Sequence, residues 1–179
     1  MMRVNSRMRA LLCDPAFEAD DSGLPPDARA TAEAGWRLGP SGALLLAAMS
    51  PKDAPDVPAS GIGRHEYEVN DVYLSLDDLR GDESTFLAKA ASRSLSFAVD
   101  MLKRGLSLPG SETLQASVSI FVDTTDEVFP LQGGVVRFFT RRGDHPDWFG
   151  DLEAFTLEAI AVLDATDIDV FRNQSIGER

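Results

Sequence analysis

The strongest pattern along the chain is a stripe of apolar side chains at helical spacing in residues 82–104. Leu87 and Leu95 recur on one side of this stretch, and polar residues fill the other side. Asp82 is a favourable N-cap, and Gly105 follows the last turn as a typical helix stop. The sequence therefore predicts a long amphipathic helix over residues 82–104.

Alternating apolar and polar positions predict two strands after this helix. Residues 114–122 alternate with a period of two, which is typical of a half-buried strand. Residues 135–141 place Val136 on one side and Arg137 and Arg141 on the other. We expect the two strands to pair as an antiparallel hairpin with a long loop.

Shorter apolar runs precede the long helix. Residues 36–38 and 43–49 flank a Gly-Pro-Ser-Gly sequence, which predicts a β-hairpin. Residues 65–76 are also strand-like, but their apolar phase shifts at Asn70 and Asp71. Because a period of two cannot absorb an odd step, the shift predicts a bulge or a tight turn.

Three further segments complete the predicted elements. Residues 8–13 form an apolar run that suggests a strand, and the Ala-rich stretch 26–34 suggests a short helix that begins at a proline. A second long helix is predicted from Pro146 or Asp147 to Leu163, with aromatic and aliphatic side chains on one face.

Together these elements predict an α+β fold with a mainly antiparallel sheet. The two long amphipathic helices are expected to pack on one face of the sheet, which gives a two-layer sandwich. A chain of 179 residues, of which 44% are hydrophobic, is consistent with one domain over residues 1–179. Residues 50–64 are predicted to be a Pro-rich loop, and residues 164–179 a polar C-terminal tail.

The chain is strongly acidic, with 29 Asp and Glu against 17 Lys and Arg and a net charge of -12. Such a field repels phosphate backbones and anionic membrane surfaces, and it attracts basic proteins. We therefore expect a basic protein partner, with no nucleic acid and no membrane; charge that serves solubility alone is the alternative. A single cysteine, an N-terminal apolar stretch too short for an export signal, and the excess of Arg over Lys together indicate a bacterial cytoplasm.

One local cluster resembles catalytic chemistry. His145 lies between Asp144 and Asp147 at a predicted helix start, where it can act as a general base or a metal ligand. Alternatively, the two aspartates cap the helix and His145 is exposed. Because the sequence contains no nucleophile or nucleotide-binding motif, we expect no cofactor, and binding is favoured over catalysis.

Clusters of acidic residues supply the remaining functional clue. If several clusters share one face, they form a landing site for a basic protein, with an exposed tryptophan as anchor. The cluster after the predicted strand 114–122 can instead hold a hard cation or form a solvated turn. The candidate partner-binding residues are Asp77, Asp78, Asp123, Asp126, Glu127 and Trp148.

These observations favour an acidic, non-enzymatic protein-binding module. An immunity protein or inhibitor that neutralises a basic toxin or effector protein has this combination of size and charge. A secretion chaperone for an effector has the same profile and is an alternative. A small metal-dependent hydrolase that uses the region of His145 is the alternative from a different class.

Overall fold

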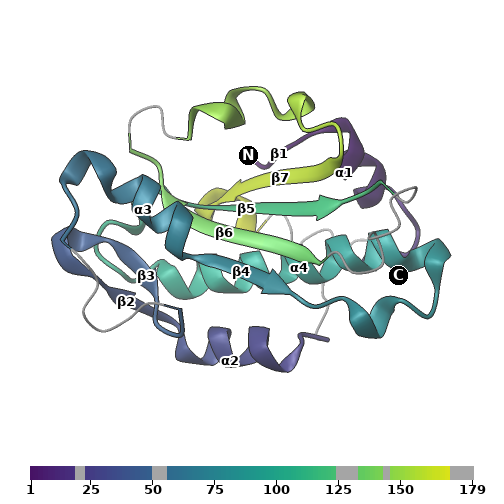
Figure 1. The fold of residues 1–179 in the computed structure, drawn as a ribbon, viewed down its shortest axis with the longest axis horizontal. Helices are drawn as coiled ribbons and strands as arrows, with labels where there is room; N and C mark the ends of the chain where they lie inside the picture. The colour runs from purple at the N-terminus through teal and green to yellow at the C-terminus, as the bar shows by residue number, and fades with distance from the viewer. Residues whose placement is uncertain (19–22, 50–55, 124–132, 143–145, 170–179) are drawn as a thin grey trace.

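The structure is a computed structural model that describes residues 1–18, 23–49, 56–123, 133–142 and 146–169. Within these residues the largest element is a five-stranded sheet whose neighbouring strands are all antiparallel (Figure 1). A separate two-stranded hairpin accompanies it. In spatial order the strands of the large sheet are β1 (Arg3–Val4), β7 (Glu158–Asp164), β5 (Leu114–Phe121), β6 (Gly134–Thr140) and β4 (Asp71–Leu74), and those of the hairpin are β2 (Trp36–Leu38) and β3 (Leu44–Leu46).

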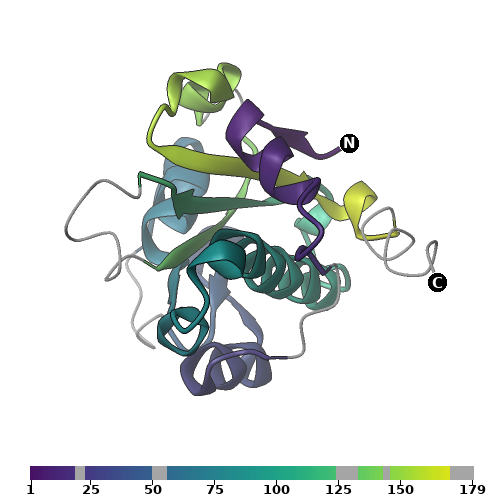
Figure 2. The ribbon, with the colours of Figure 1, turned by 90° about the vertical axis from the view of Figure 1, so that its right-hand side faces the viewer.

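One long helix, α4 (Glu83–Gly105), lies along one face of the large sheet (Figure 2). The Asp82 carboxylate accepts the backbone N–H of Ser84 at 3.2 Å, which confirms the predicted N-cap. Phe97 and Met101 are fully buried in the core between this helix and the sheet. The amphipathic pattern therefore identified both the helix and its buried face.

The structure confirms the α+β class and the mainly antiparallel sheet. Strands β5 and β6 pair with each other, and β2 and β3 form the predicted hairpin. The Ala-rich stretch forms the helix α2 (Pro26–Ala34), which packs beside α4. These segments carry strong local signals, because their periodicity and their turn residues agree.

The predicted strand at residues 8–13 is wrong, because this segment belongs to the helix α1 (Ser6–Leu12). Asn5 caps the helix by accepting the Met8 N–H at 2.9 Å. A short apolar run cannot distinguish a strand from a buried helix by periodicity alone. The N-cap residue was the available signal for the helix.

The first half of the predicted strand at residues 65–76 is also wrong. The helix α3 (Ile62–Val69) occupies it, and β4 begins at Asp71. The phase shift at Asn70 is therefore a junction between a helix and a strand, where the Asn70 N–H donates to the Glu66 carbonyl at 2.8 Å. No bulge is needed to explain the shift.

The second long helix predicted over residues 146–163 is wrong. Two 3₁₀ turns, Asp147–Gly150 and Leu152–Ala154, precede the strand β7. Ala161 of this strand faces α4, whereas Ile160 lies in a smaller core on the other face of the sheet. A strand buried on both faces lacks the alternation that identifies a strand in a sequence. The described residues thus contain one long helix where two were expected.

The large sheet has side-chain cores on both faces. The helices α1, α2 and α4 lie on the side of the larger core, and α3 lies on the opposite side (Figure 2). Of the two long helices predicted to pack on one face, only α4 does so. The turns between β6 and β7 also cover part of that opposite side. The smaller core there consists of Phe139, Phe149, Leu152, Ile160 and Val162, with Tyr67 and Phe155 packed against it.

Parts of the predicted Pro-rich loop and of the predicted polar tail form regular structure and have buried residues. The predicted loop at 50–64 ends earlier, because Ile62 is buried at the start of α3. The predicted tail at 164–179 begins with a 3₁₀ turn, Ala165–Asp167, after which Ile168 is buried in the larger core. Residues 50–55 and 170–179 lie outside the described part of the chain.

Two buried polar side chains, Glu66 of α3 and Asn70 at its C-cap, join the hairpin to the large sheet. The Glu66 carboxylate accepts the backbone N–H groups of Leu44 at 2.7 Å and of Thr140 at 2.6 Å. The Asn70 amide donates to the carbonyls of Leu44 at 2.8 Å and of Phe138 at 3.1 Å. Helix α3 therefore supplies the hydrogen bonds that a strand between β3 and β6 would otherwise make.

Candidate functional site

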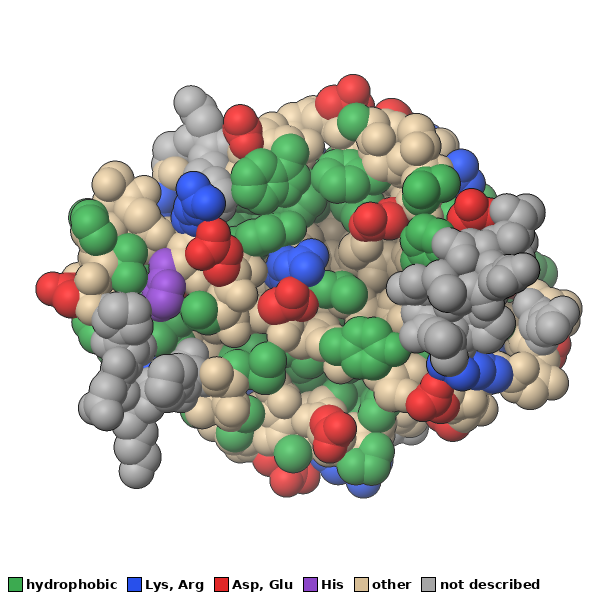
Figure 3. Space-filling view, in the orientation of Figure 1, with side chains coloured by type: hydrophobic (Ala, Val, Ile, Leu, Met, Phe, Trp, Pro, Cys, Tyr) green, Lys and Arg blue, Asp and Glu red, His purple; other side chains and the backbone are tan. Residues whose placement is uncertain are grey.

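The side of the large sheet opposite α4 is only partly covered, and its uncovered part is the best candidate for a binding surface. Alternate side chains of β4 and β6 point to this side. Figure 3 shows it: hydrophobic side chains surround a shallow hollow, and a basic and an acidic side chain lie together near its centre. We define the open face as the residues Tyr67, Asp71, Tyr73, Val135, Arg137 and Trp148.

An ion pair between neighbouring strands lies within the open face. Arg137 and Asp71 are register partners on β6 and β4, and Nε and Nη2 of Arg137 donate to Oδ2 of Asp71 at 3.1 and 2.8 Å. Burial lowers the pKa of Arg137, but Tyr67 and Asp71 together more than offset burial and raise that pKa. The guanidinium is therefore a fixed positive charge whose side chain is 30% exposed.

Tyr67 links this ion pair to an aromatic cluster. Cζ of Arg137 lies 5.3 Å from the Tyr67 ring centroid, within the range of a cation–π contact. The Tyr67 ring centroid lies 5.5 Å from those of Phe139 and Trp148, and both contacts are edge-to-face. Phe149 also packs against Trp148, at 6.2 Å between centroids. Trp148 is nevertheless 44% exposed, so it is held in place while it presents a large apolar surface to solvent.

Tyr73 is a second exposed aromatic residue on this face. It lies on β4 two residues after Asp71, and it is 54% exposed. Its ring lies over Gly133, where any Cβ atom would collide with the ring and with the Leu74 carbonyl. The absence of a side chain at Gly133 therefore lets the Tyr73 ring lie close to the backbone before β6.

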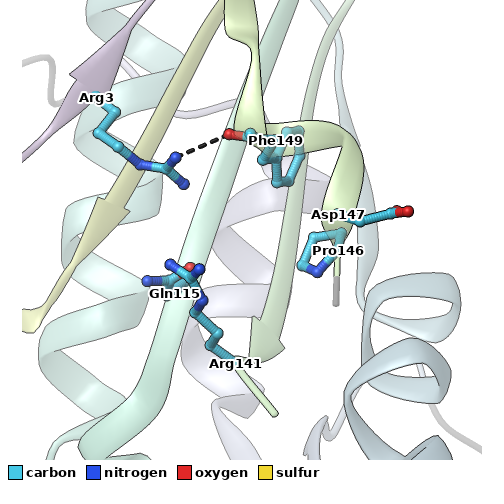
Figure 4. A pocket seen from close by; sticks show the side chains of 7 residues that line it. Arg3, Gln115, Arg141, Pro146, Asp147 and Phe149 are labelled. Carbon is cyan, nitrogen blue, oxygen red and sulfur yellow. Dashed lines mark hydrogen bonds between the residues drawn. The ribbon is translucent and has the colours of Figure 1, made fainter. Parts of the chain in front are cut away.

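A small pocket of about 200 Å³ lies on the same side of the sheet (Figure 4). Arg3 borders it and donates from Nη1 to the Phe149 carbonyl at 2.8 Å. In Figure 4 the guanidinium of Arg141 lies beside Gln115, whereas the Asp147 carboxylate points away from both. The lining residues are Arg3, Gln115, Arg141, Pro146, Asp147, Phe149 and Gly150.

Two of the predicted acidic residues are engaged by arginines of the chain itself. Asp77 forms an ion pair with Arg80 at 2.5 Å. Both carboxylate oxygens of Asp78 accept from Arg93, at 2.6 and 2.7 Å, and this hydrogen bonding is the main cause of the lowered pKa of Asp78. The Arg93 side chain is 3% exposed, so Asp78 compensates a buried positive charge.

The other predicted partner-binding residues lie on different elements. Asp123 follows β5 and is half-buried, and Trp148 lies in the turn Asp147–Gly150. Asp126 and Glu127 fall outside the described residues. Among the members of the predicted set that the structure describes, only Trp148 belongs to the open face.

The three residues predicted as metal ligands, Asp144, His145 and Asp147, cannot be placed together in the described part of the chain. Asp144 and His145 lie outside the described residues. Asp147 lines the pocket together with Arg3 and Arg141, and two guanidinium groups disfavour a cation there. Within the described part of the chain, no group of three or more His, Cys, Asp or Glu side chains is arranged to hold a metal ion.

Sequence reasoning missed most of the open face. The alternation in residues 135–141 did place Arg137 and Arg141 on the polar side of a strand. The partner of Arg137 was not predictable, because Asp71 is 66 positions away along the chain. Tyr67 lies in α3 and not in the strand predicted over residues 65–76.

Comparison of the chain with known protein families, with curated proteins and with solved structures gives no match. Among the described helices, none has both the length and the apolar composition needed to cross a bilayer.

Proposed function

We propose that this chain is a non-catalytic protein-binding module that holds its partner on the open face. The observation that carries the proposal is the joint exposure of Trp148, Tyr73 and Arg137 on the open face. Tryptophan, tyrosine and arginine are the residue types that most often dominate the binding energy of protein interfaces.

The fixed conformation of these side chains supports the proposal. Trp148 packs edge-to-face on Tyr67, and two hydrogen bonds from Arg137 to Asp71 orient the guanidinium. Binding costs free energy wherever it immobilises side chains, at about 0.5–1.5 kcal/mol for each flexible one. Side chains that are already oriented avoid part of this cost, so the open face is suited to a rigid partner surface.

The expected partner is a basic protein. The net charge of -12 favours encounter with a cationic surface, and the resulting steering raises the association rate at low salt. Different residues therefore attract the partner and bind it. The charged residues that attract it are spread over the chain, whereas the aromatic side chains that contact it lie on the open face. An immunity protein or inhibitor of a basic toxin or effector combines these two properties.

The proposal is tested by capture from the native lysate with matched baits. The baits are the wild-type chain, Trp148→Ala, Tyr73→Ala and a control, Leu106→Ala. Leu106 is 49% exposed at the C-cap of α4 and does not belong to the open face. We expect the wild type and the control to retain the same basic protein, with less retained as salt rises.

Both open-face variants are expected to lose that protein. Capture of nothing at any salt concentration contradicts the proposal, and so does equal capture by all four baits. Overlapping circular dichroism spectra of the four baits show that a loss of capture does not arise from unfolding.

A further inference from the structure

The pocket beside Phe149 has a local charge opposite to that of the whole chain. Arg3 and Arg141 both contribute to its lining, whereas its one acidic lining residue, Asp147, points its carboxylate away from them (Figure 4). Arg3 uses Nη1 to bond the Phe149 carbonyl at 2.8 Å, and neither guanidinium forms an ion pair with another described residue. The two guanidinium groups therefore give the pocket a positive charge that no described carboxylate neutralises.

The donors of the pocket suit a carboxylate group. A guanidinium presents a planar fork of N–H groups that matches the two oxygens of a carboxylate. Gln115 adds an amide that can donate a further hydrogen bond. Gln115 belongs to β5, and the Arg141 N–H donates to the carbonyl of Thr113, just before β5, at 2.9 Å.

The other wall of the pocket is apolar and buried. Pro146 and Phe149 are both buried, and Phe149 packs against Phe139 at 6.0 Å between ring centroids. The volume of about 200 Å³ is somewhat larger than the ~150 Å³ of a cavity that holds benzene. A ligand of about ten non-hydrogen atoms, with a ring and one acidic group, therefore fits.

We infer that the pocket between Arg3, Arg141 and Phe149 is a binding site for a small aromatic monocarboxylate. The carboxylate lies against Arg3, Arg141 and Gln115, and the ring lies against Phe149 and Pro146. A monoanion is favoured over a dianion such as phosphate, because the net charge of -12 penalises a second negative charge. This inference does not depend on the proposed protein-binding function.

The test is a titration of the full chain with sodium benzoate, followed in heteronuclear NMR spectra that include the arginine Nε–H signals. Acetate has the carboxylate without the ring, so it tests the contribution of the apolar wall. Inorganic phosphate tests the preference for a monoanion. Sodium chloride at equal ionic strength is the blank. We expect saturable shifts of the Arg3 and Arg141 signals with benzoate, and affinity for acetate and phosphate at least tenfold weaker.

Variants assign the site. Arg141→Gln is expected to weaken benzoate binding at least tenfold, because a charge-assisted hydrogen bond is lost. Asp147→Asn is the control that keeps both arginines, and its affinity is expected to be equal or higher. Amide spectra that overlay with those of the wild type show that each variant is folded.

Three outcomes overturn the inference. The first is the absence of saturable shifts with benzoate, and the second is affinity for phosphate or acetate as high as that for benzoate. The third is unchanged benzoate affinity in folded Arg141→Gln.

Discussion

Glu66 is the side chain on which the attachment of the hairpin to the large sheet most depends. It is fully buried, and its carboxylate accepts three hydrogen bonds. The Leu44 N–H donates to Oε1, and the backbone N–H and hydroxyl of Thr140 donate to Oε2. Substitution of Glu66 by Gln keeps the shape of the side chain and exchanges one acceptor for a donor.

The expected loss of stability follows from these bonds. The Glu66→Gln variant can direct its one side-chain carbonyl oxygen to Thr140, which leaves the buried Leu44 N–H facing an NH₂ group. A buried donor without an acceptor costs about 1–3 kcal/mol, and the remaining bonds lose their charge assistance. Because neutralisation also relieves the cost of burying a charge, the net expectation is a decrease of about 2 kcal/mol in the free energy of unfolding.

The assay is urea denaturation followed by tryptophan fluorescence. Trp36 of β2 reports on the hairpin, since its indole N–H donates to the Met101 carbonyl at 2.9 Å. With a slope of about 2 kcal/mol/M, a loss of about 2 kcal/mol moves the urea midpoint down by about 1 M.

Glu68→Gln is the matched control for this substitution. Glu68 lies about half a turn further along α3, its side chain is 57% exposed, and it pairs with Arg64 at 2.8 Å. An exposed ion pair of this kind contributes less than about 1 kcal/mol. If Glu66→Gln shifts the midpoint no more than Glu68→Gln does, the structural role assigned to Glu66 is wrong.

Three further substitutions test other buried contacts. Asn5→Ala removes the cap of α1 and the bonds of the same amide to β7, and we expect a loss of about 3 kcal/mol by urea denaturation. Gly63→Ala places a Cβ 2.6 Å from the Thr140 carbonyl oxygen, and we expect a loss of about 2 kcal/mol and a lower melting temperature. Asp78→Asn weakens the pair with Arg93, and we expect it to be less stable than the wild type at pH 7 by about 1 kcal/mol or less, since the Asp78 side chain is 64% exposed. The pKa of Asp78 is lowered by folding, so this difference is present above about pH 4 and shrinks as the pH falls through the folded pKa.

Each of these three expectations can fail in a defined way. A melting temperature of Gly63→Ala equal to that of Gly81→Ala contradicts the close contact at Gly63, because a Cβ at Gly81 meets no atom within 4 Å. Wild-type stability in Asn5→Ala contradicts the bridging role of its amide. A stability difference for Asp78→Asn that stays constant from about pH 7 to about pH 3 contradicts the ion pair as its source.

The fold was predictable from the sequence wherever an element buries one face. The helix α4 and the strands β5 and β6 have a clean helical or strand period, because one side meets the core and the other is more polar. The strand β7 was mistaken for a helix because both of its faces are buried. The helix α3 was mistaken for a strand because its buried positions include the polar residue Glu66, and the buried Asn70 follows it, so neither carries a hydrophobic signal.

The candidate site was less predictable than the fold. The residue type of Trp148 is alone enough to make it a possible anchor, and the structure adds that its side chain is 44% exposed. The pairing of Arg137 with Asp71 depends on the contact between β6 and β4, which no local pattern encodes. The pocket likewise combines Arg3 near the N-terminus with Arg141 near the end of β6.

The proposed binding function is tested most directly by the affinity of Trp148→Ala for the captured basic protein, measured by calorimetry beside the wild type and Leu106→Ala. Truncation of a central interface tryptophan costs about 2 kcal/mol or more, which corresponds to about 30-fold weaker binding. We predict a loss of this size for Trp148→Ala and an unchanged affinity for Leu106→Ala. Wild-type affinity in folded Trp148→Ala would contradict the assignment of the open face as the binding surface.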